Sequence, residues 1–166
     1  MIRTIICNSM FLLINDKKYQ CSIGRNGLTH TKQEGDLATP IGQFQLRGCY
    51  YRADRIMPPP ETALPLQALA PNDGWCDAPT HMLYNKPVKL PFDASHERLW
   101  RDDHAYDLIV PLSYNDNPTL AGKGSAIFWH IAQPDWRSTE GCVAIARDAM
   151  LEILPFCDEN TVMMIG

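Results

Sequence analysis

His130 and Cys142 are the two residues of this sequence whose types and spacing best suit nucleophilic catalysis. His130 lies in an apolar, strand-like run, and Cys142 follows twelve residues later, after a loop that contains Pro134. Such a loop can fold back and bring the imidazole to the thiol. A free thiol is only a few per cent ionised at neutral pH, so a neighbouring imidazole either raises the thiolate fraction or accepts the proton during attack. The pair predicts acyl transfer through a cysteine nucleophile and a histidine base.

Gly141 precedes the candidate nucleophile and allows the backbone to turn sharply there. We expect the N–H groups of Gly141 and Cys142 to point at a developing oxyanion, an interaction whose loss typically raises the barrier by ~3–4 kcal/mol. The ordinary alternative is that Cys142 is an inert, buried apolar side chain and that His130 is a satisfied polar group at a strand end. Spacing alone leaves both interpretations open.

The other cysteines do not form a metal site or an obvious redox pair. The sequence contains six cysteines, at Cys7, Cys21, Cys49, Cys76, Cys142 and Cys157, with no C-x-x-C spacing. Cys7, Cys21 and Cys49 lie within strand-like runs, and Cys157 ends a helical pattern, so core packing is the expected role of each. We expect no metal and no cofactor.

The elements that must position these residues are mostly strands. Apolar, β-rich runs occur at Ile2–Cys7, Phe11–Ile14, Tyr19–Ile23, Gln43–Tyr51, Tyr106–Leu112, Ser125–Ile131 and Thr161–Ile165. The segment Ala146–Phe156 has apolar residues at helical spacing and ends near Pro155. The chain is therefore predicted to be one mainly β domain, residues 1–166, with one or two short helices.

Residues 57–92 hold eight of the thirteen prolines, a density that excludes a long helix. This segment is predicted to be a long ordered loop or a set of edge segments. Long loops in small domains are usually functional. We expect it to lie over or beside the cleft that holds His130 and Cys142.

Charge and length exclude several classes of protein. The 166 residues carry 15 Lys and Arg against 19 Asp and Glu, a net charge of −4. No basic footprint for nucleic acid or an anionic membrane is present, and no apolar run approaches the ~20 residues of a membrane-spanning helix. The first residues resemble an export signal, but Asn8 and Ser9 interrupt the apolar run. We therefore expect a cytoplasmic protein with free thiols, with export to the periplasm as the alternative.

Two motifs resemble those of the YkuD-type L,D-transpeptidases. The spacing from His130 to Thr139-Glu140-Gly141-Cys142 is similar to the family's signature, H-x(n)-[ST]-x-G-C. Upstream, Gly35–Phe44 resembles the family's ATPxGxF segment, and the stretches Ser95–Trp100 and Tyr106–Val110 resemble its short, single-domain branch. The resemblance covers nearly the whole chain and implies a β-sandwich catalytic domain acting on peptidoglycan stem peptides or muropeptides.

The resemblance also implies roles for individual residues. Carried over by position, Cys142 is the nucleophile, His130 is the general base and Gly141 shapes the oxyanion turn. Thr139 holds the place of the motif serine, and Glu140 stands where many members have a second histidine.

Ala144 stands where many members have an arginine or asparagine that contacts substrate. Arg137 and Arg147, with Arg98 and Arg101, are possible replacements, because a guanidinium can bind a carboxylate with two hydrogen bonds. A solvated surface charge remains the alternative for each. The candidate substrate-binding residues are Thr139, Glu140, Arg137, Arg147 and Trp129.

The leading functional hypothesis is an L,D-carboxypeptidase that transfers the acyl group to water and removes the terminal D-Ala from tetrapeptides during peptidoglycan recycling. The first alternative is an exported L,D-transpeptidase that forms cross-links or exchanges D-amino acids. A non-catalytic peptidoglycan-binding module and a thiol redox sensor are more distant alternatives. The resemblance also implies covalent inhibition by carbapenems, and we expect a monomer.

Overall fold

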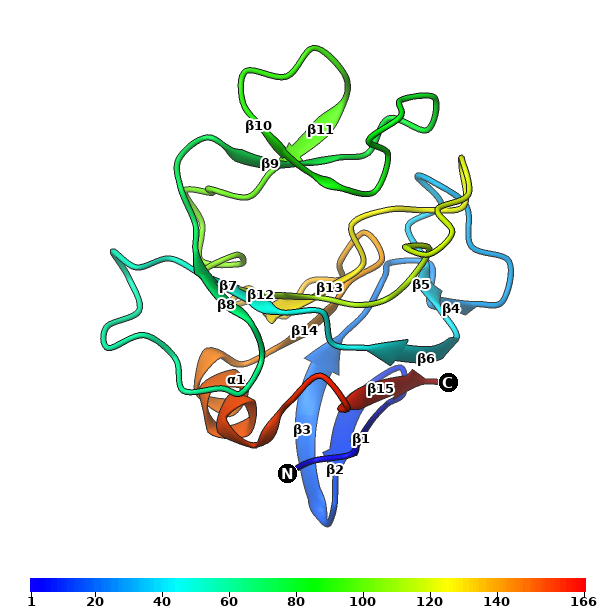
Figure 1. The fold of residues 1–166 in the computed structure, drawn as a ribbon. Coiled ribbons are helices and arrows are strands. Elements are labelled where there is room, and N and C mark those ends of the chain that lie inside the picture. The colour runs from blue at the N-terminus through cyan, green and yellow to red at the C-terminus, as the bar shows by residue number, and fades with distance from the viewer.

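The computed structural model describes residues 1–166 and consists mainly of short strands around one curled sheet (Figure 1). In spatial order, the ten strands of this sheet are β6 (Gly42–Gln45), β15 (Val162–Ile165), β1 (Thr4–Cys7), β2 (Phe11–Ile14), β3 (Lys17–Ser22), β14 (Val143–Ile145), β13 (Phe128–Ile131), β12 (Leu108–Pro111), β7 (Cys49–Tyr51) and β8 (Leu66–Ala68). Three neighbouring pairs are parallel: β1 with β15, β13 with β14, and β7 with β8. The mainly β fold that the sequence predicts is confirmed.

Two smaller sheets complete the fold. β10 (Pro87–Lys89), β9 (Asp73–Cys76) and β11 (His96–Arg98) form a three-stranded sheet, which Figure 1 shows above the central strands. β4 (Leu28–Thr29) pairs in parallel with β5 (Thr39–Pro40). Pro87 and Pro40 both lie in edge strands, where a missing N–H breaks no pairing on the free side.

One short helix follows the strand after the site. α1 (Arg147–Ile153) runs into a 3₁₀ turn, η1 (Leu154–Phe156), which has Pro155 in its first turn. Its buried residues Met150 and Ile153 pack on the main core, as the helical spacing predicts. With seven residues, α1 is too short to cross a membrane, and the chain has no other α-helix.

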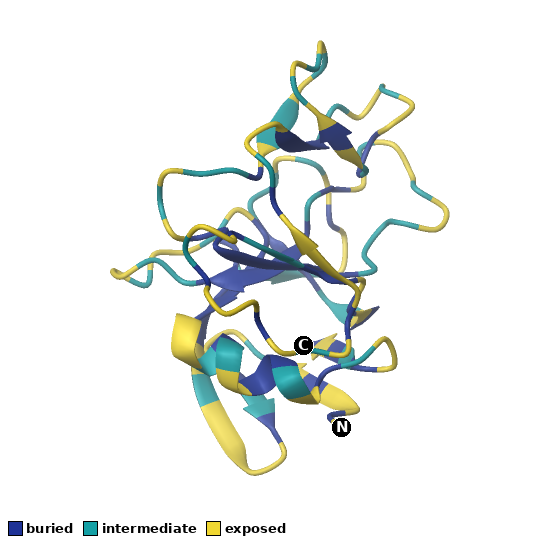
Figure 2. Cartoon of the chain, turned by 60° about the vertical axis from the view of Figure 1, so that its left-hand side comes forward, coloured by how far each residue is buried: buried dark blue, intermediate teal, exposed yellow.

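Strand alternation divides the central strands between two cores. Successive side chains of a strand point to opposite faces of the sheet. In β13, Trp129 and Ile131 join the larger hydrophobic core, whereas Phe128 joins a smaller one beneath the three-stranded sheet. Because both faces of β12, β13 and β14 are covered, all of their residues are buried, as the dark strands in the middle of Figure 2 show. His130 therefore shares a face with Phe128.

Most of the predicted strands are present, with two differences. The run Gln43–Tyr51 was expected to be one strand, but it breaks at residues 46–48. The reason is that β6 pairs with β15 whereas β7 pairs with β12, so the two halves lie in different parts of the sheet. The run 57–92 contains no helix, as predicted, but it contributes three strands, β8, β9 and β10. Of this run, Asp77 reaches the wall of the cavity described below.

Candidate active site

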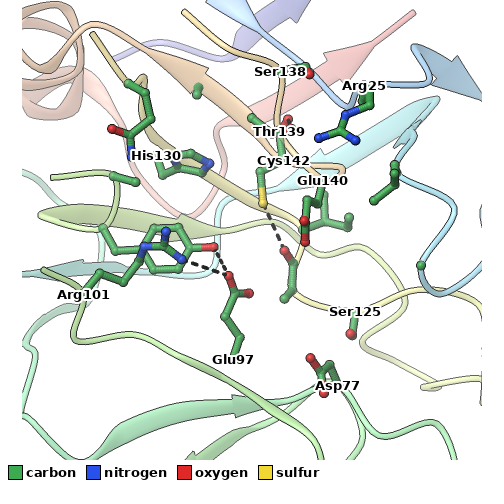
Figure 3. Close-up of a pocket in the computed structure, with 18 of the residues that line it drawn as sticks. Arg25, Asp77, Glu97, Arg101, Ser125, His130, Ser138, Thr139, Glu140 and Cys142 are labelled. Carbon is green, nitrogen blue, oxygen red and sulfur yellow. Dashed lines mark hydrogen bonds and ion pairs between the residues drawn. The ribbon is translucent and has the colours of Figure 1, made fainter. Parts of the chain in front are cut away.

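A cavity of about 620 Å³ lies between the three-stranded sheet and the main sheet at its central strands β13 and β14 (Figure 3). His130 lies in β13, and Cys142 directly precedes β14. Parallel pairing of these strands places His130 opposite Ala144, two residues beyond Cys142. The connection of residues 132–142 folds back without a helix, and both side chains line the same cavity. The spacing in the sequence predicts this arrangement.

The imidazole of His130 is held in one tautomer. Its Nδ1 lies 2.9 Å from the carbonyl oxygen of Ile131. Because a carbonyl only accepts hydrogen bonds, Nδ1 carries the proton and Nε2 keeps its lone pair. Burial and, to a smaller extent, the positive charge of Arg101 lower the pKa of His130 to about 4, so the ring is neutral at pH 7. A neutral ring with a free Nε2 can act as a general base.

The Cys142 thiol is buried and protonated. Its Sγ lies 3.2 Å from the carbonyl oxygen of Ala126, to which it donates, and accepts from the backbone N–H of Phe128 at 3.4 Å. Burial raises the pKa of Cys142 to about 12, and the nearby carboxylates of Glu97 and Glu140 raise it too. Both groups are therefore neutral at pH 7, and the thiol is bonded to backbone groups and not to the imidazole of His130. An imidazole can either raise the thiolate fraction or accept the proton during attack, and the neutral state of both groups favours proton acceptance during attack.

The turn before the nucleophile requires glycine. Gly141 has φ of +142°, and a β-carbon there would lie 3.0 Å from the carbonyl oxygen of Ala38. Its N–H donates to Thr139 Oγ1 at 3.2 Å, and that hydroxyl donates to the Cys142 carbonyl at 2.7 Å. The expected oxyanion role of the Gly141 N–H is thus corrected, because this group is already bonded. The Cys142 N–H has no partner within the chain and is available to an oxyanion.

The Gly-Asp-Leu-Ala-Thr-Pro segment braces this turn. Asp36 accepts hydrogen bonds from the N–H groups of Gln33 and Ala38, and it pairs with the buried Lys32. Thr39 is fully buried, and its hydroxyl lies 3.5 Å from the Cys142 carbonyl. The segment therefore packs against the turn that carries the nucleophile, and the side chains of Asp36 and Thr39 do not line the cavity.

Of the five predicted substrate-binding residues, Thr139, Glu140 and Arg137 line the cavity. Trp129 does not, because strand alternation directs it into the main core, where it has no exposed surface. Arg147 lies on α1, and its guanidinium donates to the Arg55 carbonyl at 3.2 Å, away from the cavity. The interpretation of Trp129 and Arg147 as substrate contacts is corrected by their positions.

The structure adds Glu97 and Tyr106 to the site, and of the two further candidate arginines Arg101 lines the cavity whereas Arg98 does not. Glu97 accepts a hydrogen bond from the Tyr106 hydroxyl, and the Tyr106 ring packs edge-on against His130 at 5.2 Å. Arg101 lies 5.0 Å from the centre of the same ring and pairs with Asp103. Burial raises the pKa of Glu97 to about 7. Glu97 lies in β11, a strand that is not among the apolar runs that predict strands from the sequence.

Two further residues, Arg25 and Asp77, also line the cavity without an obvious signal in the sequence. No group of three His, Cys, Asp or Glu side chains is arranged to hold a metal ion. The cavity instead offers a nucleophile, a base, one free backbone donor and charged walls, which together suit acyl transfer.

Comparison with known protein families matches residues 7–165 to YkuD, the L,D-transpeptidase catalytic domain. Comparisons with curated proteins and with solved structures give no match. The match covers nearly the whole chain, and Cys142 and His130 both line the cavity. This chain therefore belongs to the YkuD family of L,D-transpeptidase catalytic domains, whose members act on peptidoglycan through a cysteine nucleophile.

Proposed function

We propose that this protein is an L,D-carboxypeptidase that removes the terminal D-Ala from peptidoglycan tetrapeptides. The observation that carries the proposal is the neutral pair of Cys142 and His130 in one polar cavity of a YkuD-family chain. The substrate is a stem peptide or muropeptide, and the bond broken joins the third residue to D-Ala.

The first half-reaction forms a thioester. The Cys142 sulfur attacks the carbonyl carbon of the third residue while Nε2 of His130 takes the thiol proton. The Cys142 N–H donates to the resulting oxyanion. Collapse of this intermediate breaks the C–N bond, and His130 gives its proton to the departing amine of D-Ala. Attack by a thiol that is neutral until His130 takes its proton is consistent with the raised pKa of Cys142, because this mechanism does not require a thiolate before the substrate reacts.

The second half-reaction uses water. With D-Ala gone, His130 deprotonates a water molecule that attacks the thioester carbonyl, and the proton passes to the leaving Cys142 sulfur. The tripeptide is released with a new carboxylate. The cavity is lined largely by polar side chains and is open to solvent, which supports access of water to the thioester. An amine acceptor would enter the same space, so an exported cross-linking or exchanging enzyme is the alternative.

We also propose that the protein works in the cytoplasm as a monomer, on soluble muropeptides. The six cysteines are all free and buried, which suits a reducing compartment. Fractionation of the native protein tests this location, and recovery from the periplasm would contradict it.

The product profile tests the reaction. The protein is incubated with a free or disaccharide-linked tetrapeptide, with and without an added D-amino acid. We expect tripeptide and D-Ala in both reactions, and no turnover by the Cys142→Ser variant. An exchanged tetrapeptide as the main product would contradict hydrolysis and support transfer to amines. A carbapenem should add its mass to Cys142, which peptide mapping would locate.

A further inference from the structure

The charges that line the cavity are separated around Cys142. In Figure 3, Arg25 lies on one side of the thiol, next to Ser138 and Thr139, whereas Glu97 and Asp77 lie on the opposite side. The carboxylates act on one another, because Asp77 and Glu140 both raise the pKa of Glu97. A bound peptide thus meets Arg25 on one side of the nucleophile, and on the other side it meets Glu97 and Asp77 together with Arg101, which is paired with Asp103.

Three arginines line the cavity, and they differ in their partners. Arg101 already has carboxylate partners, because its guanidinium is 2.7 Å from Asp103 and 4.0 Å from Glu97. The guanidinium groups of Arg25 and Arg137 make no ion pair and no hydrogen bond within the chain. Two cations without carboxylate partners therefore face a cavity in which every other strong charge is acidic or paired.

Arg25 and Arg137 come from two backbone segments that run side by side. The N–H of Arg25 donates to the Thr139 carbonyl at 2.9 Å, and Gly24 and Thr139 form an isolated parallel bridge. A β-carbon at Gly24 would lie 2.6 Å from the carbonyl oxygen of Leu37, so the backbone is tightly packed there. Arg25 is thus anchored to the same motif loop that carries Cys142.

The neighbouring loop holds Arg25 from the other side. The N–H of Asn26 donates to the Leu37 carbonyl at 3.0 Å, and its side-chain amide donates to the Asp36 carbonyl at 2.8 Å. Leu37 itself has φ of +58°, an uncommon conformation for a residue with a side chain. The Arg25 backbone is therefore fixed on both sides, so the side chain starts from a defined position next to the loop that carries Cys142.

We infer that Arg25, together with Arg137, binds the carboxylate of the residue that leaves, and so sets the direction in which the peptide crosses Cys142. This inference rests on the proposed function, in which the leaving residue carries a free carboxylate. The guanidinium groups bind it by charge-assisted hydrogen bonds. The carboxylates of Glu97 and Asp77 repel an anion from the other side, so the reversed orientation is disfavoured.

Binding to Cys142→Ala protein, which cannot turn over, tests the inference. Isothermal titration compares a tetrapeptide that ends in D-Ala with the same peptide ending in D-Ala amide. We expect the amide to bind at least about tenfold more weakly, the usual effect of losing a hydrogen-bonded charge. Adding Arg25→Gln should weaken binding of the acid by a similar factor and leave binding of the amide unchanged.

Arg147→Gln is the matched control, because Arg147 is an exposed arginine outside the cavity. It should leave both affinities unchanged, and melting temperatures of all variants show whether they are folded. Arg25→Lys should restore part of the affinity for the acid. Equal losses for acid and amide in Arg25→Gln, or no loss, would overturn the inference.

Binding and turnover together distinguish failure of the inference about Arg25 from failure of the proposed carboxypeptidase function. Suppose that the wild-type protein turns over the tetrapeptide but Arg25→Gln changes binding of the acid and the amide equally. This result would overturn the inference about Arg25 and leave the proposed function intact. Selective binding of the acid without any turnover would overturn the carboxypeptidase proposal and support the carboxylate site. Failure of the Cys142→Ala protein to bind either peptide would overturn both.

Discussion

His130 and Cys142 are both neutral at pH 7 because the same burial acts oppositely on their charged forms. Removing an imidazolium from water lowers its pKa, and removing a thiolate from water raises its pKa. The two values, about 4 for His130 and about 12 for Cys142, leave both groups uncharged over a wide pH range. In the proposed mechanism the thiol loses its proton only during attack, when the sulfur electron pair is already forming the bond to the carbonyl carbon.

The first prediction concerns the base. His130→Gln should lower kcat by about 100-fold or more, the usual contribution of general acid–base catalysis. Steady-state hydrolysis of the tetrapeptide measures this loss. His30→Gln is the matched control, because His30 is exposed and outside the cavity. If His130→Gln kept wild-type turnover, another residue would have to be the base.

The second prediction concerns the protonation state of the pair. At pH 8, wild-type protein and Cys142→Ser should show the same absorbance near 240 nm, because a thiol of pKa about 12 contributes no thiolate signal. Activity should persist at pH 5.5 and fall only toward pH 4, since protonation of His130 removes the base. Glu97→Gln separates this fall from the titration of Glu97 near pH 7. A thiolate signal at pH 8 would indicate an ion pair and refute the neutral mechanism.

At the scale of elements, the site depends on the connection between two parallel strands. Parallel neighbours usually need a helical crossover, but β13 and β14 are joined by an irregular loop that returns directly to the edge of the sheet. This loop presents Cys142, and the segment around Ala38 supports it from below. Small changes in the contact between these two segments should move the sulfur.

The third prediction tests that contact. Gly141→Ala places a methyl group 3.0 Å from the Ala38 carbonyl oxygen at a φ that favours glycine, so the loop must shift. We expect the variant to lose most activity and about 1–3 kcal/mol of stability. Gly122→Ala is the control, because Gly122 also has positive φ (+73°) but its added methyl group would contact nothing. Equal effects of both variants on activity would mean that the Ala38 contact does not matter.

At the scale of the whole molecule, the cavity reduces stability at neutral pH. The three-stranded sheet places Glu97 over the smaller core, where burial raises its pKa from 4.5 to about 7. Between these values the folded protein holds a proton that the unfolded chain releases. The free energy of unfolding therefore falls as the pH rises through this range. The Glu97 side chain retains 28% of its exposure, so the effect is moderate.

The fourth prediction follows from this linkage. Glu97→Gln should raise the melting temperature by a few degrees at pH 8 and leave it almost unchanged at pH 4.5, where Glu97 is already protonated. The amide oxygen keeps an acceptor for the Tyr106 hydroxyl. Thermal unfolding at both pH values measures the difference. A variant that is less stable at pH 8 would show that the carboxylate is stabilised and that its pKa is not raised.

The family signature, the mainly β fold and the two residues at the centre of the site could all be predicted from the sequence. These features are local, because a short apolar, β-rich run such as Phe11–Ile14 predicts a strand, and a histidine, a turn and a Gly-Cys pair lie within one stretch of chain. Because successive side chains of a strand point to opposite faces of the sheet, the sequence also predicts that Trp129 and His130 lie on opposite faces. Trp129 was nevertheless interpreted as a substrate contact.

Only the tertiary structure decided what surrounds Cys142. Arg25, Asp77 and Glu97 are between 45 and 117 residues from the cysteine in sequence, and each looks like an ordinary surface charge there. Pairing of β9 with β11, and of Gly24 with Thr139, brings them to one cavity. The protonation of Glu97 depends on its burial and on the charges around it, and both are properties of the folded chain. The chemistry of the site is therefore local in sequence, whereas its electrostatics and the orientation of its substrate are decided by long-range contacts.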